Sequence, residues 1–169
     1  MQPLIHCIGC RALVPDIDGP TFRYPHSSSA GCWKLYGEIL EKEFSIYKYP
    51  SFHRLTLDAY AVQHPGDQTP QTTQSVNVHL AALHMVLVKK MEYKRVTRLM
   101  DALIRKNKGT FEWLDPPENR GAITVVGVVK AATFEEHKKL VEDWAESVYH
   151  AWVNYHATID RLVETVLNG

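Results

Sequence analysis

The stretch QSVNVHLAALHMVLVKK, residues 74–90, decides the fold class of this chain. Four aliphatic residues recur in it at spacings of four, three and four, which places them on one face of a helix. They are Val76, Leu80, Leu83 and Leu87. A helix with a single apolar face must bury that face against other elements. The stretch therefore predicts one member of a helical bundle.

Helical patterns continue on both sides of this stretch. Residues 133–166 carry the longest one, which opens with the capping box Thr133–Glu136 and repeats apolar residues for about 30 positions. Residues 67–73 between two patterns are polar and predict a loop. The remaining predicted helices span 29–43, 51–64 and 93–106.

The predicted fold is all-α, an antiparallel bundle of four to five helices in a single domain, residues 1–169. Residues 1–28, which prolines interrupt, are expected to be irregular and pinned by a metal, with the bundle in residues 29–169. Residues 110–130 break the helical pattern and predict a short β or 3-10 element. The β-branched run 122–129 fits a strand or a short helix equally well.

Composition limits the classes of partner. The chain has 19 Lys plus Arg and 19 Asp plus Glu, so no nucleic acid or anionic membrane is expected as a partner. No apolar run approaches the ~20 residues that a membrane span needs. The first residues lack the pattern of a signal peptide, so we expect a cytoplasmic, reducing location. The expected partner is an unidentified small molecule or protein, and a homodimer is also considered.

The chain has three cysteines, Cys7, Cys10 and Cys32. The first two form a CxxC pattern, and the third stands at the start of the helix predicted over 29–43. In a reducing compartment a CxxC pattern indicates metal binding or redox chemistry rather than a structural disulfide.

The predicted helices bring a fourth ligand to these cysteines. Short loops make consecutive helices antiparallel, so Cys32 at the start of one helix lies beside His64 at the end of the next. Cys7 and Cys10 can fold back over the same end, and His79 is the alternative fourth ligand. Thiolates with an imidazole suit tetrahedral zinc. Unligated buried cysteines and a CxxC redox pair remain open alternatives.

A second group of polar residues lies deeper in the predicted bundle. Asp58 lies beside an apolar stripe, where an unpaired charge is costly, so we expect it to have a partner. It could form a salt bridge with an arginine, orient a histidine or act as a base. His79 and His156 are expected to face inward, and with His53 they would place three imidazoles around an open metal. A satisfied core histidine is the other interpretation of each. Asp58, His79 and His156 are therefore the candidate catalytic residues.

Five motifs stand out in the sequence: Cys7–Cys10, Gly31-Cys32-Trp33, Asp58–Gly66, Gln74–Leu80 and Trp113–Pro117. With these motifs the chain resembles a family of uncharacterised bacterial proteins. One departure is Arg11, where such proteins often have glycine after the CxxC. The resemblance implies a shared fold and site but no activity. A looser similarity is to the DinB/YfiT-like metal-binding helix bundles, although their usual paired histidines on one late helix are missing here.

The sequence thus predicts a zinc-binding helical bundle of unknown biochemical role, with a structural zinc held by Cys7, Cys10, Cys32 and His64. Two alternatives stand beside it. One is a metal-dependent hydrolase or transferase with an open histidine-ligated site. The other is a redox sensor that uses the CxxC dithiol.

Overall fold

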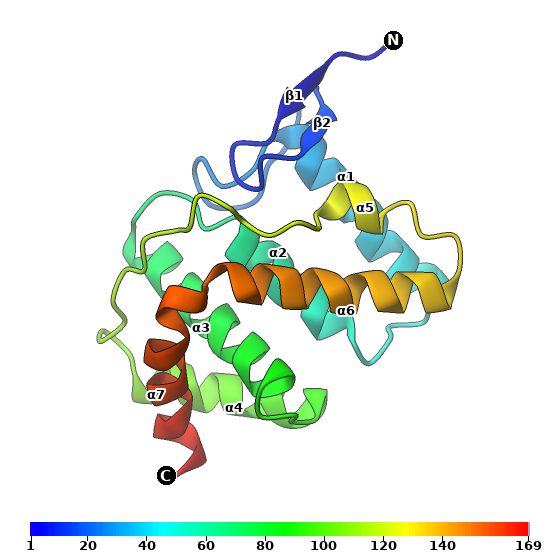
Figure 1. Cartoon of the computed structure of the whole chain (residues 1–169). Coiled ribbons are helices and arrows are strands. Elements are labelled where there is room, and N and C mark those ends of the chain that lie inside the picture. The colour runs from blue at the N-terminus through cyan, green and yellow to red at the C-terminus, as the bar shows by residue number, and fades with distance from the viewer. Residues whose placement is uncertain (169) are drawn as a thin grey trace.

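The computed structural model describes residues 1–168, which form seven α-helices and one two-stranded sheet (Figure 1). The all-α prediction is confirmed. A π-helical turn, Lys42–Ile46, continues the first helix, and a 3-10 turn, Val153–Tyr155, joins the last two. The elements are β1 (Leu4–His6), β2 (Leu13–Pro15), α1 (Ala30–Glu41), α2 (His53–Gln63), α3 (Pro70–Leu87), α4 (Tyr93–Lys106), α5 (Val125–Val128), α6 (Phe134–Ala151) and α7 (His156–Leu167).

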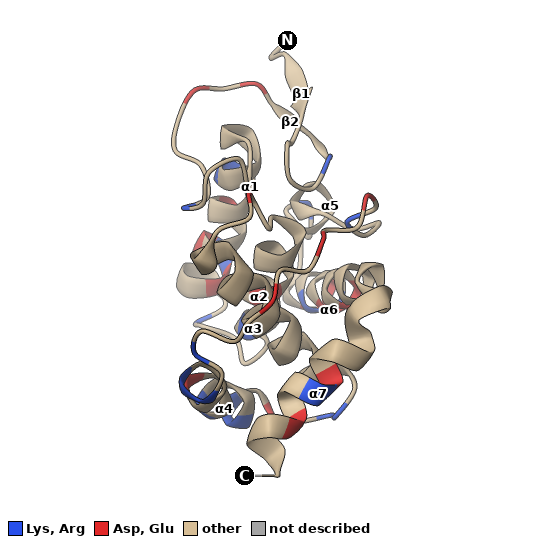
Figure 2. Cartoon of the chain, turned by 90° about the vertical axis from the view of Figure 1, so that its left-hand side faces the viewer, with Lys and Arg blue, Asp and Glu red and all other residues tan. Residues whose placement is uncertain are grey.

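The core is built around α2 and α3. Helix α2 packs against α3 and α6, while α3 also contacts α4 and α7. Large side chains fill the space between them, among them the fully buried Trp144, Trp152 and Tyr60. Among residues 1–168, every helix is too short or too polar to cross a membrane. Basic residues gather on α4, and the acidic residues that balance them are spread over several elements (Figure 2).

Helix α3 begins four residues earlier than its apolar stripe indicates, at Pro70 instead of Gln74. Thr69 is the N-cap, and its hydroxyl accepts a hydrogen bond from the Thr72 amide at 3.1 Å. The Thr72 hydroxyl accepts one from the Thr69 amide at 2.9 Å, and proline suits the first helical position. The loop predicted over 67–73 is therefore wrong for residues 70–73.

The single long helix predicted over 133–166 is also wrong. It breaks after Ala151, and α7 turns away from the axis of α6 (Figure 1). At the break the Tyr149 carbonyl accepts a hydrogen bond from Nε2 of His156 at 2.8 Å, and the two rings stack with centroids 4.0 Å apart. Trp152 is buried at the corner. These side-chain contacts stabilise the break between α6 and α7, although apolar residues recur at helical spacing on both sides of it.

Residues 110–130 contain one short helix, α5, so the choice left open for 122–129 falls to a helix. The chain before α5 is held by Gln63, whose side-chain amide donates to the Arg120 and Ile123 carbonyls at 3.0 and 2.8 Å. Hydrogen bonds from the buried Gln63 side chain therefore satisfy these two carbonyls, which in a strand would bond a neighbouring strand.

The N-terminal segment is more regular than predicted. Strands β1 and β2 pair antiparallel, with Ile5 opposite Val14, and form a hairpin that projects beyond the helices (Figure 1). The hairpin loop carries the CxxC pattern, and Arg11 adopts a left-handed conformation with φ of 67°. All of β1 is exposed, whereas Val14 in β2 is fully buried. Little apolar surface therefore holds this hairpin to the helices.

Candidate metal centre

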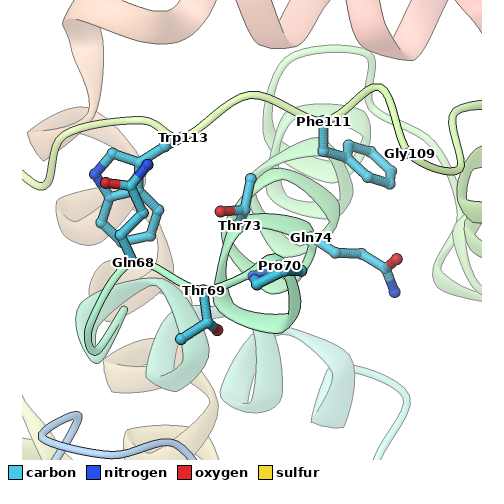
Figure 3. Close-up of a pocket in the computed structure, with 8 residues that line it drawn as sticks. All are labelled: Gln68, Thr69, Pro70, Thr73, Gln74, Gly109, Phe111 and Trp113. Atoms are coloured by element: carbon cyan, nitrogen blue, oxygen red, sulfur yellow. The ribbon is translucent and has the colours of Figure 1, made fainter.

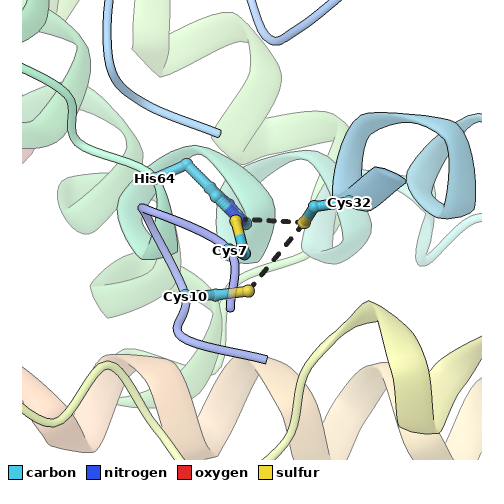
Figure 4. A group of neighbouring side chains, drawn as sticks. All are labelled: Cys7, Cys10, Cys32 and His64. Carbon is cyan, nitrogen blue, oxygen red and sulfur yellow. Dashed lines mark hydrogen bonds between the residues drawn. The ribbon is translucent and has the colours of Figure 1, made fainter. Parts of the chain in front are cut away.

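Four potential metal ligands meet where the hairpin, α1 and α2 join (Figure 4). One ligand atom from each of Cys7, Cys10, Cys32 and His64 lies within 4.8 Å of all the others. All four side chains are buried. The predicted ligand set thus comes together. His64 occupies the fourth place rather than His79, which does not belong to this group.

The spacings are those of a tetrahedral site. A zinc–sulfur bond of about 2.3 Å places two thiolate corners about 3.8 Å apart, and a thiolate and an imidazole corner about 3.5 Å apart. The sulfurs of Cys10 and Cys32 lie 3.8 Å apart, and Cys32 Sγ lies 3.3 Å from Nε2 of His64. The distance between the sulfurs is far longer than a disulfide bond, and all three cysteines are free.

The helix directions explain why these residues meet. Cys32 lies in the first turn of α1, and His64 is the C-cap of α2. Glu43 just beyond α1 bonds His53 at the start of α2, so the two helices run antiparallel. The hairpin then turns Cys7 and Cys10 over this end of the helix pair (Figure 4). This part of the site follows from the sequence argument.

Hydrogen bonds around the ligands favour a bound cation. His64 Nδ1–H donates to the Tyr60 carbonyl at 2.7 Å, which leaves the Nε2 lone pair directed at the sulfurs. The Tyr60 hydroxyl donates to Cys32 Sγ at 3.6 Å, and the Ser29 amide donates to Cys7 Sγ at 3.5 Å. Both donors point at sulfur atoms, and such bonds stabilise thiolates.

Without a cation the three buried thiols cannot all lose their protons. Hydrogen bonds from Cys10 and then Cys32 lower the pKa of Cys7. The hydrogen bonds of Cys32 to Cys10 and Cys7 raise the pKa of Cys32, and burial raises it further. Only one thiolate is therefore favoured in the empty cluster, because like charges in a buried site repel. A divalent cation removes that conflict and allows all three cysteines to ionise.

Gly9, between the two cysteines of the CxxC pattern, has no room for a side chain. A Cβ there would lie 2.1 Å from the Ser27 carbonyl oxygen and 2.5 Å from Cδ2 of the ligand His64. The hairpin can approach α2 this closely only because residue 9 is glycine.

We expect Gly9→Ala to lower zinc affinity by more than about tenfold, because the clash moves Cys7 and Cys10 away from His64. Competition with a colorimetric zinc chelator measures this change. Gly37→Ala in α1 is the matched control, since a Cβ at Gly37 meets nothing within 4 Å. Equal zinc affinity in the two variants would contradict the close approach described above.

The candidate catalytic residues are only partly brought together. Asp58, almost fully buried, accepts from His79 Nδ1 at 2.7 Å and pairs with Arg54 Nε at 3.2 Å. Both partners considered for this carboxylate are thus present. His156 bonds the Tyr149 carbonyl instead, and the three imidazoles expected around an open metal do not gather. Within residues 1–168 the Cys3His cluster is the one group of three or more side chains suited to a metal.

His53 bonds a buried carboxylate, that of Glu43, instead of facing His79 and His156, and the sequence did not predict this contact. Glu43 is fully buried, and one of its carboxylate oxygens bonds His53 Nδ1. The other oxygen accepts from the Thr56 hydroxyl at 2.6 Å and from Nε2 of the fully buried His137 at 2.8 Å. The sequence does contain one indication of this burial: His137 lies four residues before Val141, on the same face of the helix, and Val141 is buried.

The surface also has a hollow at the start of α3, with a volume of about 550 Å³ (Figure 3). Amides, hydroxyls and two aromatic rings, including Gln68, Thr73, Phe111 and Trp113, line it. None of the lining side chains titrates, so this hollow offers hydrogen bonds but no acid, base or metal ligand.

Comparison with known proteins places the chain in a family but assigns it no activity. The sequence pattern of a family of unknown function (DUF5946) matches residues 5–153, which include all four ligands of the metal centre. No curated protein and no solved structure matches the chain.

Proposed function

Because the chain belongs to DUF5946, a family of unknown function, we propose its function from the site: it is a metal-binding protein in which a structural zinc fastens the N-terminal hairpin to the bundle. One observation carries this proposal. The four ligand atoms of a Cys3His set lie within 4.8 Å of one another in a site closed to solvent.

The chemistry of the ligands supports zinc. Three thiolates and one imidazole are soft and borderline ligands, which disfavours magnesium and calcium and is common in closed zinc sites. Four protein ligands fill a tetrahedron and leave no position for water or substrate. A metal held in this way stabilises structure and activates no nucleophile.

The location supports a structural role. The four ligands come from three separate parts of the fold: the hairpin loop, the first turn of α1 and the end of α2. Strand β1 contributes no buried side chain, so apolar burial alone gives the hairpin a weak attachment. Coordination bonds from Cys7 and Cys10 supply the missing attachment.

Metal analysis of the purified protein tests this proposal. We expect one zinc per chain, lost in Cys32→Ser and retained in His79→Ala, because His79 bonds Asp58 and not the cluster. Absence of stoichiometric zinc in the wild-type protein overturns the proposal. Zinc loss in His79→Ala overturns the assignment of His64 as the fourth ligand.

Mass spectrometry under mild oxidant separates this function from a CxxC redox sensor. Thiolates bound to zinc resist oxidation, so the wild-type protein should keep Cys7 and Cys10 free. The disulfide should form only after chelation. Rapid formation of that disulfide in the zinc-loaded protein would favour the redox sensor instead.

A further inference from the structure

A second cavity lies at the opposite end of α2 from the metal centre. It has a volume of about 660 Å³ and is bounded by the loop before α2, the first turns of α2 and the start of α4. This volume is within the range of small-molecule sites, about 300–1,000 Å³. We call it the His53 pocket, and the lining residues that matter are Tyr49, His53, Arg54, Leu57 and Tyr93.

The polar centre of this pocket is a histidine whose orientation is set by a buried acid. His53 is almost fully buried, and its Nδ1 bonds the carboxylate of Glu43. Hydrogen bonds from Thr56 and His137 hold that carboxylate from behind. Because a carboxylate only accepts hydrogen bonds, Nδ1 carries a proton, and in the neutral ring Nε2 then has a free lone pair.

Nothing in the described chain uses this lone pair. Nε2 of His53 makes no hydrogen bond within residues 1–168, whereas the Nδ1 side of the ring is occupied by Glu43. Nε2 is thus the polar ring atom available to a molecule in the pocket. A carboxylate behind Nδ1 makes Nε2 a stronger acceptor, as in histidines that act as bases.

Aromatic and apolar side chains surround this acceptor. The ring of Tyr49 lies 4.7 Å from the His53 ring, yet Tyr49 is 61% exposed. Leu57 is also exposed at 38%. Lys48 and Tyr49 both have left-handed backbone conformations, with φ of 56° and 61°. Such strain persists where the surrounding structure enforces it, often at binding sites.

Two basic residues, Arg54 and Lys94, line this pocket together with the acidic Glu92, and Arg54 is already neutralised. Arg54 pairs with the buried carboxylate of Asp58 at 3.2 Å and donates to the Thr97 hydroxyl at 3.2 Å. Its charge is therefore compensated from behind, so the pocket offers little attraction to a full anion. A neutral ligand with a hydrogen-bond donor fits these features better.

We propose that the His53 pocket binds a small planar aromatic molecule with a hydroxyl group, whose O–H donates to Nε2 of His53. The aromatic ring packs against Tyr49 and Leu57, the exposed apolar residues of the pocket. The site is independent of the metal, because His53 and His64 stand about 16 Å apart at the two ends of α2.

Isothermal titration at pH 7 with para-cresol, which is neutral at that pH, tests this site, with toluene as the probe that lacks the hydroxyl. We expect para-cresol to bind the wild-type protein at least about tenfold more tightly, because one hydrogen bond separates the probes. His53→Asn should abolish that preference. The asparagine amide can still donate to Glu43 in place of Nδ1, but it has no group in place of Nε2.

Two further variants make the test decisive. Leu57→Arg fills the pocket at an exposed position and should prevent binding of both probes. His26→Asn removes an exposed histidine–Asp67 pair outside the pocket and should change neither affinity. The proposal is overturned if the wild-type protein shows no preference for para-cresol over toluene, if His53→Asn retains that preference, or if Leu57→Arg still binds para-cresol.

Discussion

If the metal centre holds the proposed zinc, its removal is expected to detach the N-terminal hairpin and lower the stability of the whole protein. A ligand at a thousand times its dissociation constant stabilises the native state by about 4 kcal/mol. For a chain of this size that corresponds to a fall in melting temperature of about 10 °C. The loss should concentrate in residues 1–28, because β1 is exposed and Val14 is the one fully buried apolar side chain of the two strands.

Hydrogen exchange with and without chelator measures this effect. The amides of Cys7 and Arg11, which bond the Ala12 and Cys7 carbonyls at 2.8 and 3.0 Å, should lose their protection. Amides in the middle of α3 should keep theirs, since that helix packs on α2, α4 and α7. Added zinc should reverse the change. Unaltered protection in the hairpin after complete zinc removal would show that apolar packing alone holds it.

The second large effect is expected at Glu43. Glu43→Ala should cost about 3–5 kcal/mol of unfolding free energy, because three buried donors lose their hydrogen bonds to a carboxylate and each unsatisfied donor costs about 1–3 kcal/mol. Here His53, His137 and Thr56 would all lose their acceptor. Urea unfolding measures the loss. Glu38→Ala, at an exposed position on α1, is the control and should change stability by less than about 0.5 kcal/mol.

The Glu43 effect should depend on pH. Burial alone would raise the pKa of Glu43, but hydrogen bonds from His137, His53 and Thr56 lower it below the ordinary value. A carboxylate with a lowered pKa in the folded state stabilises the protein above its unfolded pKa, about 4.3. That stabilisation disappears as pH falls through the folded value. The stability gap between wild type and Glu43→Gln should therefore shrink below about pH 4. A gap that stays constant between pH 7 and pH 3 would contradict a charged Glu43.

Much of the metal centre could be predicted because its determinants are local. A CxxC pattern, a cysteine at a helix start and a histidine before Pro65-Gly66 are all visible in the sequence. Short connections then force α1 and α2 to run antiparallel, which brings Cys32 to His64. The start of α3 was missed because its cap uses two threonines, Thr69 and Thr72, instead of the usual acidic partner.

The likeness to three-histidine bundles stays a prediction, since no solved structure matches the chain. The expected set of His53, His79 and His156 fails for a physical reason. Helical spacing shows that a histidine faces inward, but not which buried group it meets there. His79 meets Asp58, His53 meets Glu43 and His156 meets the backbone of Tyr149. The buried His53 and the half-buried His79 and His156 are thus each hydrogen-bonded by a different partner.

The sequence by itself determined the helical class and the four candidate ligands of the metal centre, because apolar periodicity, helix ends and ligand spacing are properties of short segments. Only the tertiary structure decided the Glu43 network and the His53 pocket. Glu43 and His137 are 94 residues apart, and their contact depends on how α6 packs against α2. Buried polar groups take whichever partner the packing places within reach, and no local pattern encodes that choice.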